Sequence, residues 1–161
     1  MAQGLVDLHT HTTASDGTDT PEQLVRRAVS LGVSTLAITD HDTLDGVDSV
    51  IEVAARSGLT LIRGIELSTR VSEESDPRRR NAHLLAYFLS EPGPAFRAWL
   101  QGLRKYRRER NQRIAERLQE LGIDVTLREA EELGRNITAR PHFAAVMIRK
   151  GYVSNIREAF D

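Results

Sequence analysis

The chain has 161 residues, of which 40% are hydrophobic and 28% charged, and its formal net charge at pH 7 is -1. This length allows one domain, or one domain and part of another, and the composition excludes a disordered chain and a coiled coil. The small net charge excludes a global field that would attract nucleic acid, so any polyanion site must be local. Cysteine is absent, which excludes disulfides and a cysteine nucleophile and leaves His, Asp and Glu as metal ligands.

The beginning of the sequence lacks the basic and apolar regions of a signal peptide. No apolar run approaches the roughly 18 residues that indicate a membrane span. We therefore expect a cytoplasmic protein without a membrane partner.

The first half of the chain alternates predicted strands and helices. Leu5 to His11 is typical of a short strand, and a capping box with Pro21 at the first helical position opens a helix that ends at Gly32. An apolar run from Val33 to Ile38 predicts a buried strand. A second helix is expected from Asp45 to Ser57, and a third strand from Leu59 to Ile62. This spacing indicates βαβ units and a parallel α/β sheet or barrel.

Polar residues gather where these strands end. His9 and His11 lie two residues apart on a strand and therefore face the same way. Asp16 follows in a turn that could fold back beside the histidines, His41 follows the second strand, and Glu66 follows the third. Because the carboxyl ends of parallel strands meet at one edge, we expect a shared site there. Imidazole with carboxylate suits Zn, Mn or Fe better than Ca.

A loop is expected over residues 72–80, followed by an apolar strand over residues 81–88 that carries His83. Purely structural roles also stay open for these residues. The His-x-His pair could lie on a half-exposed surface strand, and His83 could be hydrogen-bonded in a core. Asp40 could merely bind a backbone amide.

Together these segments resemble, in order and spacing, the motifs of the PHP (polymerase and histidinol phosphatase) metal-dependent phosphoesterases. The motifs are His9-Thr10-His11 with Ser15-Asp16-Gly17, Thr39-Asp40-His41-Asp42, Gly64-Ile65-Glu66 and His83-Leu84-Leu85. The resemblance implies a distorted seven-stranded β/α barrel, incomplete here, that holds two or three divalent Mn, Zn or Fe ions. It also implies the ligands: His9 and His11 for the first ion, Asp16 and His41 for the second, His83 for the third, and Glu66 bridging the first and third.

Within that family the chain is similar to the branch with a helical insertion that hydrolyses nucleotide phosphates. The implied substrates are nucleoside 3′,5′-bisphosphates, AMP and the ends of short oligonucleotides. Clustered divalent ions clamp a phosphate and lower the pKa of a bound water, so such a hydrolase needs no side-chain nucleophile. Two alternatives stay open: a small-metabolite phosphatase, such as one for histidinol phosphate, and a PHP module that binds metal or nucleic acid without turnover.

The second half is predicted to be a helical insertion. Pro92-Gly93-Pro94 breaks the chain, so we expect a PHP portion over residues 1–91 and an insertion over 92–161. A long helix is expected from Ala95 to Leu121. Three shorter helices should follow. A capping box from Thr126 to Glu129 opens the one over residues 127–133, another begins at Pro141, and the last runs from Ser154 to the last residue.

Four residues of the insertion are candidates for substrate binding. Arg107 and Arg110 share one helix face and could reach phosphates or bases. Arg140 and His142 flank Pro141 at a helix start, where anions are favoured. The alternatives are a solvated helix face for the first pair and an exposed arginine with a capping histidine for the second.

The sequence departs from the family at its end. Family members carry late His-Pro and Asp-x-His motifs that supply further ligands, and neither occurs here. A β/α barrel also takes about 250 residues. We therefore expect the N-terminal part of a longer protein, with weak or no activity in isolation.

Overall fold

The computed structural model describes residues 4–73, 76–134 and 138–160. The chain separates into two compact units, Met1–Arg97 and Ala98–Asp161, which are described one at a time. The longest helix, α4 (Pro94–Glu120), begins in the first unit and continues in the second. The functional division into residues 1–91 and 92–161 stays a prediction.

The first unit is built on a four-stranded sheet in the order β1 (Leu5–Thr10), β2 (Val33–Ile38), β3 (Thr60–Glu73) and β4 (Asp76–Phe88). The first three strands are parallel, as predicted, and β4 runs antiparallel to β3. The hydroxyl of Tyr87 donates to the carbonyl of Leu8 at 2.8 Å, which joins the two edge strands directly. The sheet is therefore curled into a half barrel, as expected for an incomplete α/β barrel.

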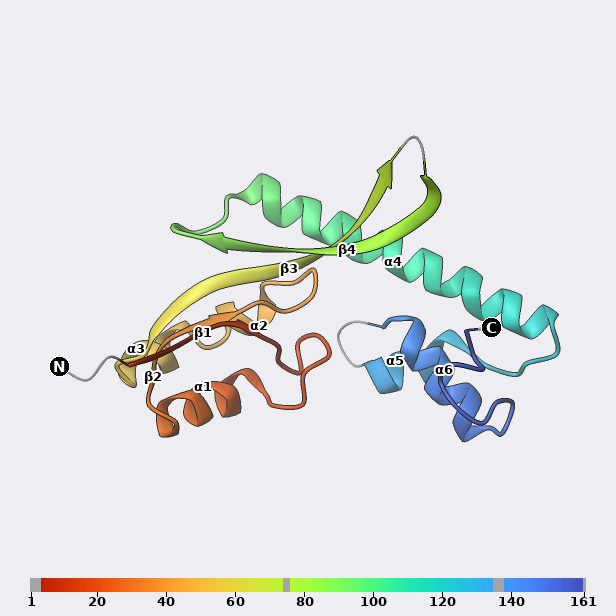
Figure 1. Cartoon of the computed structure of the whole chain (residues 1–161), viewed down its shortest axis with the longest axis horizontal. Helices are drawn as coiled ribbons and strands as arrows, with labels where there is room; N and C mark the ends of the chain where they lie inside the picture. The colour runs from red at the N-terminus through yellow and green to blue at the C-terminus, as the bar shows by residue number, and fades with distance from the viewer. Residues whose placement is uncertain (1–3, 74–75, 135–137, 161) are drawn as a thin grey trace. The chain divides into compact units, whose positions relative to one another are not determined.

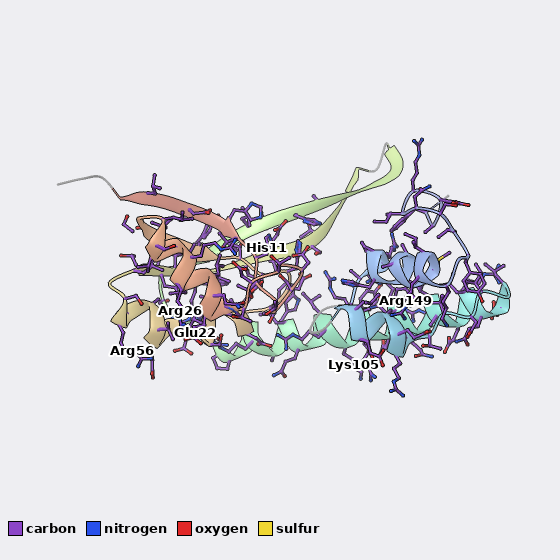
Figure 2. All side chains as sticks on the ribbon, turned by 90° about the horizontal axis from the view of Figure 1, so that it is seen from below. His11, Glu22, Arg26, Arg56, Lys105 and Arg149 are labelled. Atoms are coloured by element: carbon purple, nitrogen blue, oxygen red, sulfur yellow. The ribbon has the colours of Figure 1, made fainter. Side chains whose placement is uncertain are left out.

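Helix α1 (Pro21–Ser30) packs on β2 in the first unit (Figure 1). Its predicted capping box is confirmed, because the Thr20 hydroxyl accepts from the Gln23 amide and the Gln23 side chain accepts from the Thr20 amide. Glu22 and Arg26 form an ion pair one helical turn apart, 2.5 Å between Oε1 and a guanidinium nitrogen (Figure 2). The local signals in this segment therefore determined the helix.

The single helix expected from Asp45 to Ser57 is wrong. Two short helices, α2 (Asp45–Asp48) and α3 (Ile51–Arg56), are separated by a turn at Ser49 and Val50. The Ser49 hydroxyl donates to the Gly46 carbonyl at 2.7 Å, a local side-chain bond of the kind that competes with helix continuation. Val50 is buried to 2% exposure, so packing rather than helical periodicity fixes this segment.

One face of the sheet is covered by these helices, and the other carries the polar cluster. Arg63 of β3 reaches Asp48 of α2, with 3.0 Å between Nε and Oδ1. Because side chains alternate along a strand, Ile65 lies on the same face as Arg63 and Glu66 lies on the opposite face. Ile65 is fully buried and belongs to the core of the first unit. The strand alternation therefore turns Glu66 away from the helices.

The loop expected over residues 72–80 is also wrong. β3 continues to Glu73 and β4 begins at Asp76, so the two strands form a long antiparallel ribbon (Figure 1). The pairing is regular from Arg63 with Phe88 to Val71 with Arg80, and the register shifts before the pair of Glu73 with Asp76. Residues 74 and 75 lie outside the described residues. Pro77 is accommodated because β4 is an edge strand of the described sheet, where a missing N–H is tolerated.

The second unit contains the remainder of α4, α5 (Leu127–Gly134) and α6 (Arg140–Arg149). The predicted capping box of α5 is confirmed, since Thr126 and Glu129 exchange backbone-to-side-chain hydrogen bonds of 3.0 and 3.2 Å. The core of this unit joins residues of all three helices and the segment before α5: Ala115, Val125, Ala130, Phe143, Val146 and Met147.

The last predicted helix is wrong over the described residues. Residues 154–160 form turns, in which the Asn155 side chain accepts from the Glu158 amide at 3.0 Å. The Ser154 amide also donates to Glu158 Oε2 at 2.7 Å, so these local bonds resemble a helix cap, but no helix follows over the described residues. Among the described helices, none combines the length and apolarity that a membrane crossing requires.

Candidate metal centre

Glu66 of β3 is the centre of the polar cluster in the first unit. Its side chain is 6% exposed, and three imidazole rings contact its carboxylate oxygens. His9 Nε2 lies 2.8 Å and His11 Nε2 2.9 Å from Oε2, while His83 Nδ1 lies 2.6 Å from Oε1. His9 lies on β1, His11 directly follows β1 (Figure 2), and His83 lies on β4. The curl of the sheet therefore brings both edge strands to one carboxylate.

His41 enters the cluster from the end of β2. It forms an isolated parallel bridge with Glu66, and the Asp42 amide donates to the Glu66 carbonyl at 3.0 Å. Asp42 has φ of 51°, a left-handed conformation that Asp tolerates better than most residues. This backbone kink places the His41 ring beside Glu66, with 3.9 Å between Nδ1 and Oε2.

Asp16 reaches the cluster from the turn after β1. Its carboxylate oxygens lie 3.4 Å from His11 Nδ1 and 3.5 Å from His41 Nε2. The side chain is 56% exposed, so it borders the cluster on the solvent side. The sequence prediction that the turn folds back beside the histidines is confirmed in this geometry.

The six predicted residues form three overlapping sets of three donors. Within each set the ligand atoms lie within 4.8 Å of one another, and the sets are His9, His11 and Glu66; His11, Asp16 and His41; and His41, Glu66 and His83. Neighbouring imidazole rings follow one another at centroid distances of 5.2, 4.7 and 5.0 Å. His11, His41 and Glu66 each belong to two sets. Ions bound in neighbouring sets would therefore lie close to one another.

One buried ring nitrogen without a hydrogen-bond partner is available as a metal ligand. His41 Nδ1 is buried and has no hydrogen-bond partner among the described residues. Buried ring nitrogens normally have a partner, and one left open costs free energy unless a ligand fills the gap. Imidazole nitrogen and carboxylate oxygen are donors that Zn, Mn and Fe accept. The residues present therefore fit divalent ions, although the individual ligand roles stay predictions.

The electrostatics of Glu66 favour a cation. Burial alone would raise the pKa of this carboxyl, but hydrogen bonds from His9 and His83 and the fields of His41 and His11 outweigh it. The pKa of Glu66 therefore lies below its ordinary value. A buried group that is ionised near neutral pH supplies the negative charge that divalent ions require.

The four predicted substrate-binding residues lie in the helical unit. Arg110 of α4 donates to Asn111 Oδ1 at 2.9 Å, and Asn111 Nδ2 donates to the Thr138 carbonyl at 2.8 Å. Asn111 is 2% exposed, so this bond ties α4 to the segment that opens α6. Arg107 is half-buried on α4.

The beginning of α6 holds the other two candidates. Arg140 is its first residue and is exposed. His142 Nδ1 accepts from the Ala139 amide at 2.9 Å, which is a helix-capping contact. This capping role was the alternative reading of His142, and substrate binding by these residues stays a prediction.

One buried carboxylate beside the cluster was not predicted as a site residue. Asp40 is 1% exposed and accepts hydrogen bonds from Thr12 and Ser15 in the loop after β1. The sequence suggested only that Asp40 could bind a backbone amide, and the bond from the Thr12 amide confirms this alternative. Periodicity cannot show which distant donors such a carboxylate meets.

Comparisons with known proteins agree with this geometry. The PHP domain model matches residues 7–121. A 5′-3′ exoribonuclease from Escherichia coli is 40% identical over 159 residues, which cover 97% of this chain and 52% of the relative. A 3′,5′-nucleoside bisphosphate phosphatase from Chromobacterium violaceum is 30% identical over 159 residues, covering 96% and 53%.

A solved structure from Bifidobacterium adolescentis, assigned as a metal-dependent phosphoesterase, superimposes with a TM-score of 0.69 at 31% identity. The match covers 99% of this chain and 55% of that one. The chain thus spans about half the length of the relatives it matches. Since the family model covers more than half of the residues and includes all six members of the cluster, the chain belongs to the PHP domain family.

Proposed function

We propose that this chain carries the metal-binding part of a PHP phosphoesterase that hydrolyses phosphate esters of nucleotides. The observation that carries the proposal is the three overlapping donor sets around Glu66. Relatives named as an exoribonuclease and a bisphosphate phosphatase support a nucleotide substrate. We propose nucleoside 3′,5′-bisphosphates, AMP and the ends of short oligonucleotides as the substrates.

Two or three divalent ions, Mn, Zn or Fe, would occupy these sets. Bound there, they would supply charge stabilisation for the phosphate and acidify the attacking water. His9 and His11 would hold the first ion, Asp16 and His41 the second, and His83 the third. Glu66 would contribute to the first and the third, which is supported by its Oε2 lying beside His9 and its Oε1 beside His83.

The helical unit would supply the residues that bind the substrate. Arg140 and His142, with Arg107 and Arg110, bind the phosphates or bases of the substrate. The start of α6 supports this role, because backbone amides at a helix N-terminus favour anions and a guanidinium adds a bidentate donor pair.

The test compares Glu66→Gln with Glu52→Gln in the purified chain. Glu52 lies on α3 with its side chain 86% exposed, so it is the matched control for the same substitution. Each protein is freed of metal, titrated with Mn²⁺, and assayed for phosphate release from a nucleoside 3′,5′-bisphosphate, AMP and histidinol phosphate. We expect about two or more equivalents of Mn²⁺ and slow nucleotide-dependent release in the wild type and in Glu52→Gln, with both strongly reduced in Glu66→Gln.

Each other outcome removes a defined part of the proposal. Less than a few tenths of an equivalent of bound Mn²⁺ in the wild type would exclude the metal centre. Metal binding without release of phosphate, both by this chain and by a form extended to the length of its relatives, would identify a binding module. Preferred hydrolysis of histidinol phosphate would move the substrate to small metabolites.

A further inference from the structure

Asp40 connects β2 to the loop that follows β1. Its Oδ1 accepts from the Thr12 amide at 2.7 Å and from the Ser15 hydroxyl at 2.6 Å. Its Oδ2 accepts from the Thr12 hydroxyl at 2.7 Å. Three short bonds to two residues of one loop make this buried carboxylate a specific anchor rather than a general polar contact.

Thr12 is in turn hydrogen-bonded to the rest of the loop. Its carbonyl accepts from the amides of Ser15 at 3.0 Å and Gly17 at 2.9 Å, and its hydroxyl accepts from the Ala14 amide at 3.1 Å. A Cβ at Gly17 would lie 2.3 Å from the His11 carbonyl oxygen, so the turn closes tightly on itself. Holding Thr12 therefore holds residues 12–17 as one body.

This loop carries two members of one donor set. His11 directly precedes Thr12, and Asp16 lies between Ser15 and Gly17. The Ser15 hydroxyl is 3.5 Å from His11 Nδ1 and 3.4 Å from Asp16 Oδ1. The third member, His41, is the residue after Asp40. One carboxylate thus joins all three members of the set through the backbone or a single hydroxyl.

Helix α2 fixes Asp40 from the other side. A Cβ at Gly46 would lie 2.0 Å from Asp40 Oδ2 and 2.8 Å from the Thr12 hydroxyl oxygen. Backbone of α2 therefore lies directly against the carboxylate, and glycine is required for this approach. Asp40 is held by packing on one side and holds the loop on the other.

We propose that Asp40 is a positioning residue, which fixes the loop from Thr12 to Gly17 so that the donor atoms of His11 and Asp16 meet that of His41. The inference rests on the proposed metal centre for its consequence, although the anchoring itself is a property of the metal-free chain. Both Asp40 oxygens already accept bonds from protein donors, and Asp40 belongs to none of the donor sets found among the described residues.

The test is Asp40→Asn. The amide keeps the shape of the side chain, but its NH₂ group cannot accept the bond that Thr12 Oγ1 donates. Asp42→Asn is the matched control, because Asp42 is also 1% exposed and its Oδ1 accepts from the Ser68 amide of β3. Asn tolerates the left-handed backbone of that position as Asp does.

Two measurements are made. Hydrogen exchange in the metal-free chain should show the amides of Thr12 to Gly17 exchanging about tenfold or more faster in Asp40→Asn, while the amides of α1 are unchanged. Titration with Co²⁺, followed by its visible spectrum, should show affinity about 10–100-fold weaker and an altered spectrum. Asp42→Asn should leave loop exchange as in the wild type.

Ser15→Ala gives the same test if Asp40→Asn does not fold. It removes one of the three bonds and should weaken Co²⁺ binding by about fivefold. Where both fold, the double variant should bind little worse than Asp40→Asn alone, because the two residues act through one contact.

Unchanged loop exchange, or an unchanged Co²⁺ spectrum and affinity in folded Asp40→Asn, would overturn the positioning role even if the melting temperature falls. A wild-type chain that binds no Co²⁺ or Mn²⁺ would instead refute the proposed metal centre. In that case faster loop exchange in Asp40→Asn would still support Asp40 as the anchor of the loop, and unchanged exchange would refute it.

Discussion

At the scale of single residues, the cluster is defined by an excess of imidazoles over carboxylates. Rings from His9, His11, His41 and His83 all lie within 4 Å of Glu66. A neutral imidazole has one N–H and one lone pair, and either tautomer can turn the lone pair towards a cation. Four rings gather around one carboxylate, and the buried His41 Nδ1 has no hydrogen-bond partner among the described residues, which is the physical reason that this group favours metal binding over a hydrogen-bonded core.

The substrate side gives a prediction for Arg140. Arg140→Ala should weaken binding of a nucleoside 3′,5′-bisphosphate to the Mn²⁺-loaded chain, because a charge-assisted phosphate bond is worth about 1.5–3 kcal/mol. This range corresponds to roughly 10–150-fold in dissociation constant. Isothermal titration calorimetry measures it directly.

Arg149→Ala is the control for that experiment. Arg149 lies in the last turn of the same helix, and its guanidinium is 3.8 Å from Glu129 Oε1. We expect affinity unchanged in this variant. Equal affinity of Arg140→Ala and the wild type would remove Arg140 from the substrate site.

The positions of His9, His11, Asp16 and His41 could be predicted from the sequence, because these residues lie on or follow strands whose ends are visible in the apolar pattern. Glu66 was expected after a strand that ends at Ile62, but it lies inside β3, and His83 lies inside β4. His9 and His11 needed only the two-residue period of a strand, and their shared contact with Glu66 confirms it. Asp40 could not be assigned in the same way. Its role depends on donors that lie 25 to 28 residues away, and no local pattern encodes that pairing.

At the scale of elements, local signals succeeded where the chain closes its own hydrogen bonds. The capping boxes at Thr20 and Thr126 were predicted and are present. The errors arose where tertiary contacts decide. Residues 72–80 are charged and include Pro77, yet backbone pairing between two strands makes a ribbon whatever the polarity of the side chains. Between Asp45 and Ser57, packing of Val50 divides one expected helix into two.

The lowered pKa of Glu129 on α5 predicts how the stability of the second unit depends on pH. Its pKa is lowered from 4.5 to about 2, first by the hydrogen bond from Lys150 and then by the Thr126 amide, with burial opposing. A lowered folded-state pKa contributes stability that is fully present above pH 4.5 and is lost as the pH falls towards about 2. Glu129→Gln keeps a capping side chain but removes the charge that faces Lys150.

We therefore expect Glu129→Gln to melt a few degrees below the wild type at pH 6, with the difference shrinking as the pH falls from 4.5 towards 2. Glu132→Gln is the control, because Glu132 is 58% exposed and pairs with Arg128 on the same helix face. Thermal melts by circular dichroism at several pH values measure both. A difference that stays constant down to pH 2 would contradict the assignment.

At the scale of the whole molecule, the two units differ in charge. Asp and Glu outnumber Arg in residues 1–97, whereas Lys and Arg outnumber Asp and Glu in residues 98–161. An acidic unit suits a group of divalent cations, and a basic unit suits phosphate. The small net charge of the chain therefore conceals two opposite local balances, consistent with a polyanion site that has to be local.

The described sheet also has an apolar edge. β1 is an edge strand, and Leu5 and Val6 are 61% and 60% exposed. Further along β1 the edge is already partly used, because the His9 amide donates to its own neighbour Asp7 and the Leu8 carbonyl accepts from Tyr87. An exposed apolar edge strand pairs readily with another chain.

We expect the purified chain to self-associate through β1 as its concentration rises, and Val6→Lys to prevent this, because a lysine on an edge strand opposes pairing. Val29→Lys is the matched control, since Val29 is also exposed but lies on helix α1. Sedimentation velocity over a hundredfold range of concentration separates the cases. Association that persists in Val6→Lys would place the contact elsewhere, and association lost equally in Val29→Lys would mean that added charge, rather than the edge of β1, controls it.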